Sequence, residues 1–301
     1  MTLLDIQPVR SGDVVRSGQR IHWEEFGAGD QAVLLLPTWS IVHSDHWRHQ
    51  VAAFAVDRRV ITFDGLGNGA SDRPEDPSVY GDLLFADDAA AVLDACAVRS
   101  GVVMGSSQGG AWALAMAARH SERVSGVVFI APNVPLAPGH PARVAANQTF
   151  DEDRDVNDGW QMWNRSFWLR RYPDFLRFFF SQCFTEPDST EHVQHFWNMG
   201  MHTTPEVLLA TAGDGSADLS PELARAYAAE LTCPSLVIHG DADAITPLAR
   251  GRELAQLSGA RLVVLPGSGH EPHCRAPART NQVISRFLDT CGDSRRDKAV
   301  E

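Results

Sequence analysis

One serine of the chain has the sequence context of a nucleophile. Residues 105–109 are Gly-Ser-Ser-Gln-Gly, so that Ser107, unlike Ser106, has a glycine two positions away on each side. In a sharp turn between a strand and a helix, the central residue is strained and its side chain projects over the edge of the sheet. The small flanking residues allow the strand and the helix to approach closely. The spacing therefore predicts that Ser107 is the nucleophile.

A serine hydroxyl is a poor nucleophile until a base removes its proton, and that base is expected to be a histidine. The chain offers His270 within residues 267–272, Gly-Ser-Gly-His-Glu-Pro, a loop pattern after an apolar run. His239 lies inside an apolar run and is expected to be a buried core residue. His273 follows Pro272, where the chain should turn toward its last helix. We therefore expect His270 to be the base.

The base needs a carboxylate that fixes its tautomer and stabilises its cation. Residues 240–243 are Gly-Asp-Ala-Asp, and Pro247 follows at the expected start of a helix. The residues alone leave Asp241 and Asp243 as alternatives for this acid.

These three groups need elements that bring them to one place. Ser107 follows an apolar run at 101–104 and precedes an Ala-rich helical pattern at 110–119. Continuous apolar runs are typical of strands buried on both faces of a parallel sheet, and helices between them indicate right-handed crossovers. The further expected strands are 31–37, 59–64, 124–130, 234–240 and 261–265, and the further expected helices are 83–98, 248–257 and 277–290. The loops with the acid and the base both follow strand ends, so we expect them beside Ser107.

The strand pattern is interrupted between residues 133 and 219, where aromatic residues are concentrated. Trp160, Trp163 and Phe167 have helical spacing. Such residues commonly pack helices together, and some can also face a substrate. We therefore expect a helical lid over an apolar or aromatic pocket to which these three residues contribute.

Composition excludes several other functions. Lys and Arg number 26 and Asp and Glu 38, so the net charge is −12, which disfavours binding to nucleic acids or anionic membranes. The N-terminus lacks the pattern of a signal peptide, and a cytoplasmic location is expected. The five cysteines form no C-x-x-C pair and the 12 histidines no H-E-x-x-H motif, so no metal site or disulfide framework is expected. The oligomeric state is not indicated.

Four motifs in order resemble those of the α/β-hydrolase family over residues 20–290. They are the turn at 105–109, a Gly-x-x-Asp-x-x-x-Pro at 240–247, a Gly-x-Gly-His-x-Pro at 267–272, and the loop at 64–71. The resemblance implies an α/β fold with a mostly parallel sheet, helices on both faces and an inserted helical cap. The expected domains are a core of residues 1–132 and 221–290, a cap of 133–220 and a polar tail of 291–301.

The resemblance also implies roles for individual residues. Its spacing selects Asp243 as the acid that orients His270. The backbone N–H of Gln108, at a helix start where the dipole favours an anion, is expected to stabilise the oxyanion of the transition state. By alignment the second donor is the N–H of Trp39, which follows Pro-Thr where the family usually has His-Gly. His43, in the same loop, is a further candidate for contacting substrate.

The activity implied is that of the family's esterases and lactonases. We expect a cofactor-free serine hydrolase that cleaves a carboxylic ester, lactone or thioester through an acyl-enzyme on Ser107. Its substrate is expected to be a small molecule with an apolar or aromatic group under the cap. The same three groups also serve acyltransferases and cyclising enzymes, which are the main alternative. Carbon–carbon bond hydrolysis, perhydrolysis and a non-catalytic receptor are further alternatives.

Overall fold

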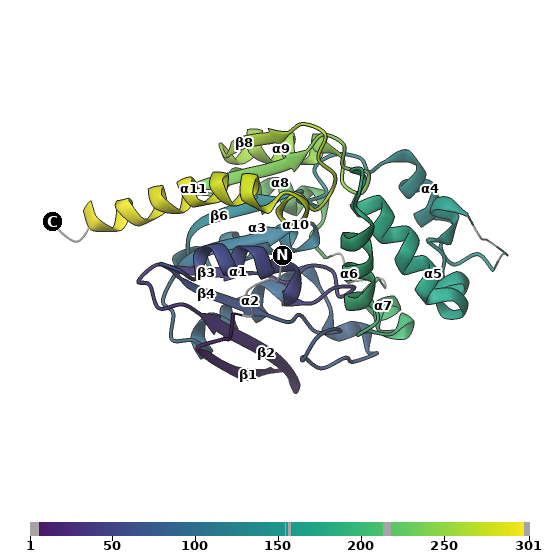
Figure 1. Ribbon diagram of the computed structural model, residues 1–301, viewed down its shortest axis with the longest axis horizontal. Helices are drawn as coiled ribbons and strands as arrows, with labels where there is room; N and C mark the ends of the chain where they lie inside the picture. The colour runs from purple at the N-terminus through teal and green to yellow at the C-terminus, as the bar shows by residue number, and fades with distance from the viewer. Residues whose placement is uncertain (1–5, 154, 156–157, 213–217, 298–301) are drawn as a thin grey trace.

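One mixed sheet forms the centre of the molecule (Figure 1). The computed structural model describes residues 6–153, 155, 158–212 and 218–297. Within them, eight strands pair in the order β1-β2-β4-β3-β5-β6-β7-β8. The strands are β1 (Arg10–Arg16), β2 (Gln19–Phe26), β3 (Ala32–Leu35), β4 (Arg59–Phe63), β5 (Gly101–Ser106), β6 (Val124–Ile130), β7 (Ser235–Gly240) and β8 (Arg261–Leu265). β2 runs antiparallel to both of its neighbours, and the other pairs are parallel, which confirms the predicted fold class.

Helices cover both faces of this sheet, as predicted (Figure 1). The helices are α1 (Arg48–Phe54), α2 (Asp82–Ala95), α3 (Gln108–Arg119), α4 (Pro141–Gln148), α5 (Arg165–Cys183), α6 (Thr190–Gly200), α7 (Pro205–Ala210), α8 (Pro221–Ala229), α9 (Leu248–Ser258), α10 (Pro272–Arg275) and α11 (Pro277–Asp297). The packing of α2, α3, α8 and α9 builds the core on one face, while α1 and α11 cover the other. None of the described helices has the length and apolarity needed to cross a membrane.

The apolar runs of the sequence correspond to strands that face two cores. In β3, Val33 and Leu35 pack in the core under α1 and α11, while Leu34 packs on the opposite side with α2 and α3. Successive side chains of a strand point to opposite faces, so a strand that is covered on both faces must be apolar throughout. This double burial explains why the central strands were predictable from the sequence.

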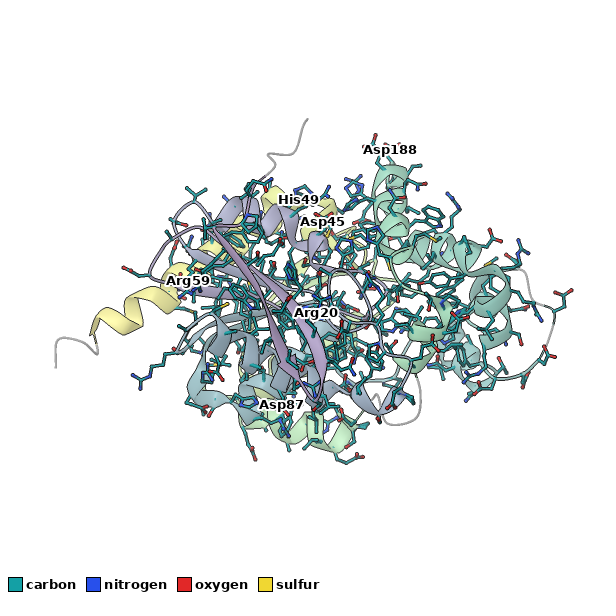
Figure 2. The ribbon with its side chains drawn as sticks, turned by 90° about the horizontal axis from the view of Figure 1, so that it is seen from below. Arg20, Asp45, His49, Arg59, Asp87 and Asp188 are labelled. Atoms are coloured by element: carbon teal, nitrogen blue, oxygen red, sulfur yellow. The ribbon has the colours of Figure 1, made fainter. Side chains whose placement is uncertain are left out.

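The hairpin of β1 and β2 was not among the predicted strands. Its turn has Ser17 and Gly18 at φ 50° and 81°, the left-handed conformations that suit a two-residue hairpin turn. The side chain of Glu25 in β2 accepts hydrogen bonds from Arg10 and Arg59, at 2.6 Å each. Figure 2 shows Arg59 on the neighbouring strand, β4. Because β1 lies at the sheet edge and is largely exposed, it lacks the continuous apolar run that marks the central strands.

Helices α4 to α7 lie between β6 and β7 and gather at one end of the sheet (Figure 1). We call these four helices, together with the described segments that join them, the cap. They enclose an aromatic core of their own, in which the Trp168 ring contacts those of Trp163 and Phe175 with centroids 5.1 and 4.5 Å apart. The absence of strands in the described part of 133–219 agrees with the sequence prediction. The next helix, α8, begins at Pro221 and packs against α3.

The C-terminal helix differs from its prediction. A helix over 277–290 with a polar tail from 291 was expected, but α11 continues to Asp297. Cys291 is buried in the core between α11 and the sheet, close to Gly126. The buried thiol gives the helix an apolar contact beyond residue 290. Residues 298–301 of the predicted tail lie outside the described residues.

Candidate active site

The turn between β5 and α3 has the geometry that its glycines predict. Ser107 has φ 53° and ψ −118°, a strained conformation for a residue with a side chain. A Cβ atom at Gly105 would overlap the carbonyl oxygen of Gly109, and one at Gly109 would overlap that of Pro37. The Ser107 N–H donates to the Ile130 carbonyl of β6 at 2.9 Å. The neighbouring strand therefore holds the strained residue in place.

A buried carboxylate holds the predicted base. The Nδ1 atom of His270 lies 2.8 Å from Oδ2 of Asp243. The other oxygen of Asp243 accepts the backbone N–H groups of Ile245 and Thr246, each at 2.8 Å. Asp241 instead accepts the N–H of Gly267 at 2.6 Å and ties the two loops together. Of the two carboxylates left open by the sequence, Asp243 is thus the one that contacts His270.

His239 adds a contact that the sequence did not predict. It is fully buried in β7, as expected, but its Nε2 atom lies 3.2 Å from Oδ2 of Asp243 and 3.0 Å from the carbonyl oxygen of Thr246. His239 lies in a strand and Asp243 in the loop after it, so the four-residue spacing between them belongs to no helix or strand periodicity. The sequence therefore contains no indication of this contact. His239 therefore helps to fix the carboxylate that orients His270.

Burial and opposite charge act against each other in this pair. Burial favours the neutral form of Asp243, but the charge of His270 and the hydrogen bonds from His239 and His270 outweigh it and lower the pKa of Asp243. Burial likewise disfavours the charged form of His270, yet the carboxylate of Asp243 outweighs it and raises the pKa of His270. The site therefore stabilises a positively charged His270, as a base that holds a proton in a transition state requires.

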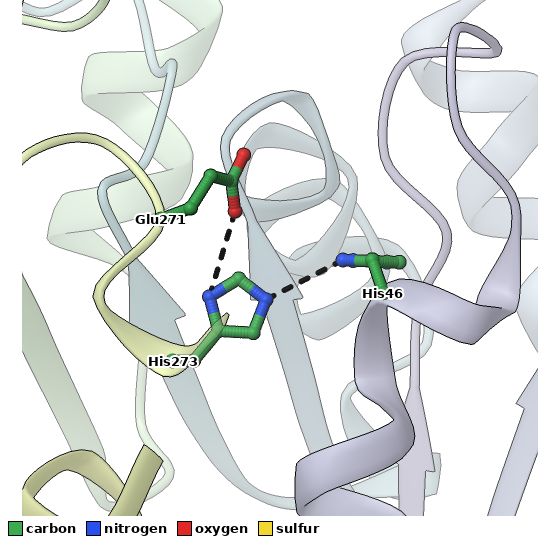
Figure 3. A group of neighbouring side chains, drawn as sticks. All are labelled: His46, Glu271 and His273. Carbon is green, nitrogen blue, oxygen red and sulfur yellow. Dashed lines mark hydrogen bonds and ion pairs between the residues drawn. The ribbon is translucent and has the colours of Figure 1, made fainter. Parts of the chain in front are cut away.

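On the Nε2 side of His270, three further buried side chains form a chain of polar groups (Figure 3). Oε1 of Glu271 lies 4.0 Å from Nε2 of His270, and its Oε2 lies 3.6 Å from Nδ1 of His273. Nε2 of His273 is 3.4 Å from Nδ1 of His46. Burial raises the pKa of Glu271 to about 7.

A metal centre is a poor description of His46, Glu271 and His273, although their ligand atoms lie within 4.8 Å of one another. A metal ion needs donor atoms that converge on a single point. The ring of His273 turns one nitrogen to Glu271 and the other to His46 (Figure 3). The three side chains therefore form a row in space, in which His273 lies between Glu271 and His46, and their donor atoms do not face a common point.

A cavity of about 380 Å³ opens over Ser107, between the sheet edge and the cap. Three residues predicted for the site, Gln108, Trp39 and Trp163, line this cavity together with Ser107. The Trp39 and Trp163 rings contact each other with centroids 5.4 Å apart, which makes one wall aromatic. The lining of the cavity thus comes from both the core and the cap and contains aromatic and polar side chains.

Three other predicted substrate contacts lie outside the lining of this cavity. Trp160 packs its ring edge-on against Phe178, with centroids 5.4 Å apart. Phe167 is buried in the aromatic core of the cap. His43 stacks on His202 at 5.2 Å and accepts a hydrogen bond from the Asp45 N–H. The contacts of these side chains are thus within the cap or between the loop after β3 and the cap.

Polar residues that the sequence did not single out also line the cavity. Asp82, at the start of α2, accepts hydrogen bonds from the side chains of Gln108 at 2.5 Å and Trp112 at 2.7 Å. Burial raises the pKa of Asp82 to about 6. Asn133 and Arg143 contribute from the chain after β6. No motif marks these positions: Gln108 links Asp82 to Asn133 by hydrogen bonds, and the cap adds Arg143.

The sequence model of one protein family matches most of the chain. Residues 31–277 match the family described as the alpha/beta hydrolase fold. The chain belongs to the α/β-hydrolase family. Its eight-stranded sheet with helices on both faces is the fold of that family. The residues matched include the strands that carry Ser107, Asp243 and His270.

Similar members of this α/β-hydrolase family are named hydrolases and peroxidases. The chain is 29% identical to a 2-hydroxymuconate semialdehyde hydrolase of Pseudomonas sp. (strain CF600), over 92% of this chain and 93% of the relative. It is 30% identical to a non-heme haloperoxidase of Rhodococcus erythropolis, over 91% and 97% of the two chains. The esterase RhEst1 from Rhodococcus sp. ECU1013 superposes with a TM-score of 0.76 at 24% identity, over 95% of this chain and all of that one. The chain is accordingly an enzyme of the α/β-fold hydrolases.

Proposed function

We propose that this enzyme is a cofactor-free serine hydrolase that cleaves a carboxylic ester, lactone or thioester through an acyl-enzyme on Ser107. The observation that carries the proposal is the buried hydrogen bond between His270 and Asp243, at the sheet edge where the β5–α3 turn presents Ser107 to the cavity. A carboxylate that orients a histidine is the arrangement that activates a serine. The named hydrolases among the relatives support the same class.

In the proposed reaction, Ser107 Oγ attacks the carbonyl carbon while His270 Nε2 takes the hydroxyl proton. Asp243 holds Nδ1 and stabilises the imidazolium. His270 then gives the proton to the leaving alcohol or thiol, and a water molecule activated by the same histidine hydrolyses the acyl-enzyme. Among the hydrogen bonds of the described residues, none joins Ser107 to His270. Catalytic hydrogen bonds commonly reach their full length and alignment only when substrate is bound, so the proposed contact is one that the substrate complex forms.

The negative charge on the carbonyl oxygen needs donors that are already in place. The N–H of Gln108 lies at the first residue of α3, where the helix dipole favours an anion. Trp39 lies on the facing loop and lines the same cavity, so its N–H is the proposed second donor. These backbone groups require no side chain, which explains how Pro-Thr can replace the His-Gly pair in this loop.

The test is hydrolysis of a panel of esters and lactones by wild type, Ser107→Ala and Ser106→Ala. Removal of the nucleophile should lower kcat by several orders of magnitude, on the scale of about 10⁶ known for triad serines. Ser106 is buried and adjacent, so its variant is a control for disturbance of the turn and should keep most of the activity. Near-wild-type turnover by Ser107→Ala would reject the proposal. Product analysis in the same assay distinguishes release of free acid from acyl transfer.

A further inference from the structure

One charged side chain in the cavity over Ser107 has no partner of opposite charge. Arg143, on α4 of the cap, lines the cavity and is half-buried. Its Nη1 donates to the backbone carbonyl of Ile245 at 3.1 Å, and its guanidinium lies 5.2 Å from the centre of the Trp163 ring. Among the described residues, no carboxylate forms an ion pair with Arg143. A guanidinium has five N–H donors, so most of them are left for a ligand.

The carboxylates of the same cavity are occupied. Asp82 accepts the hydrogen bonds of Gln108 and Trp112, and Asp151 forms an ion pair with Arg165 at 2.5 Å. Carboxylates are in excess in this chain, with 38 Asp and Glu against 26 Lys and Arg. Several described arginines lack an ion pair, but Arg143 is the one that lines the cavity of the candidate nucleophile.

A second arginine increases the positive charge at this wall. Arg250, on α9, donates to the carbonyl of Ala137 at 2.9 Å and to the side-chain oxygen of Asn133, and it too lacks an ion pair among the described residues. Burial and the charge of Arg250 lower the pKa of Arg143 to about 10, so that its guanidinium remains charged at neutral pH. Neither arginine forms an ion pair among the described residues, and Asp243, whose charge acts on Arg143, is itself hydrogen-bonded to His270. The two neighbouring cations therefore favour an anion between the cap and the core.

The position of Arg143 relates this charge to the reaction. His140 at the start of α4 contacts the carbonyl oxygen of Asp243 through Nε2 at 2.9 Å, and the N–H of Ile245 donates to the Asp243 side chain. The guanidinium is thus held against the loop of the catalytic acid, while Ser107 opens into the same cavity. A substrate whose carbonyl carbon lies at Ser107 can therefore place a second polar group at Arg143.

We propose that the substrate of this enzyme carries a carboxylate in addition to the bond that is cleaved, and that Arg143 binds this carboxylate. The inference rests on the proposed function and adds a substrate class, the half-esters and related monoacyl derivatives of dicarboxylic acids. The planar guanidinium fits a carboxylate with two parallel hydrogen bonds, and the aromatic wall formed with Trp163 reduces screening by water. Arg143 is then a specificity-determining residue, because the charge it binds is remote from the reacting carbonyl.

The test compares two substrates of similar shape. Monoethyl glutarate carries a carboxylate where ethyl 5-methylhexanoate has an isopropyl group. For wild type, kcat/KM should be at least tenfold higher for the half-ester. Arg143→Met should lower kcat/KM for the half-ester about 10- to 100-fold, mainly through KM, and leave the neutral ester within about threefold. Arg143→Lys should restore part of the difference, because it keeps the charge but loses the bidentate fork.

Arg170→Met is the matched control, since it removes one positive charge from an exposed position of the cap helix α5. It should leave the preference for the half-ester unchanged. Equal losses on both substrates in Arg143→Met, or no preference in wild type, would overturn the carboxylate site.

Calorimetric binding of glutarate to Ser107→Ala separates this inference from the proposed function. If neither ester is hydrolysed but glutarate binds in a manner that Arg143→Met abolishes, the anion site stands and the hydrolase proposal fails. If esters are hydrolysed and glutarate does not bind, the carboxylate site fails alone.

Discussion

At the residue scale, the proposed mechanism requires that the charge of His270 determine when Ser107 can be activated. His270 must be neutral to accept the hydroxyl proton, so kcat/KM should rise with pH as this residue loses its proton. The carboxylate of Asp243 raises the pKa of His270 above the ordinary histidine value of 6.5, so the midpoint of the acid limb should lie above that pH.

Asp243→Asn should move the acid limb to lower pH, because the neutral amide no longer stabilises the imidazolium. It should also lower kcat by about 10⁴, as loss of the orienting carboxylate favours the wrong tautomer. The pH profile of kcat/KM measures both effects. An acid limb that stays in place would show that Asp243 does not act on His270.

The pH dependence of protein stability gives a second test at the residue scale, through Glu271, and this test does not require enzymatic activity. Burial raises the pKa of Glu271 from 4.5 to about 7, so the folded chain holds this proton more tightly than the unfolded chain does. The stability that this proton provides is complete below pH 4.5 and is lost as the pH rises to 7.

The glutamine of Glu271→Gln remains neutral at every pH. The melting temperature of this variant, minus that of wild type, should therefore increase as the pH rises from 4.5 to 7. Thermal unfolding of both proteins at intervals across that range measures the difference. A difference that does not change with pH would contradict the burial of an ionisable Glu271.

At the element scale, the sequence predicted those elements whose residues carry a local signal. The strands at 124–130 and 261–265 have the predicted bounds, because each is a largely apolar run that ends at a turn. The glycines around Ser107 correctly indicated a strained turn, since each is excluded from having a side chain by a backbone oxygen. The strand β1 was missed because its exposed residues form no continuous apolar run. The added length of α11 was missed because the one buried thiol of Cys291 is too weak a sequence signal to extend a helix.

Gly105→Ala tests the turn as an element. The added Cβ would overlap the carbonyl oxygen of Gly109, so the strand and helix must separate. We expect a loss of about 1–3 kcal/mol in the free energy of unfolding, by chemical denaturation, together with a loss of hydrolytic activity.

Gly139→Ala is the control for this experiment, because its Cβ would meet no backbone atom and only two side chains, Val144 at 3.3 Å and Arg250 at 3.7 Å. It should change stability by no more than about 0.5 kcal/mol. Equal stability and activity of the two variants would contradict the close approach of β5 and α3.

At the scale of the whole molecule, the cavity requires two parts of the chain that are far apart in sequence. Ser107 and Trp39 come from the core, while Trp163 and Arg143 come from the cap. The motifs of the core could be predicted because each occupies a few consecutive residues. The lining of the cavity could not, since helical spacing marks Trp160 and Phe167 as strongly as Trp163, and only the docking of the cap distinguishes them.

The most direct measurement of the central claim is labelling by a fluorophosphonate, which reacts with activated serines. Wild type and Ser106→Ala should each gain one phosphonyl group by intact-protein mass spectrometry, and peptide mapping should locate it on Ser107. Ser107→Ala should gain none, and His270→Ala should react far more slowly because the serine has lost its base. Labelling of Ser107→Ala at the wild-type rate, or no labelling of wild type, would contradict the assignment of Ser107 as a nucleophile activated by His270 and Asp243.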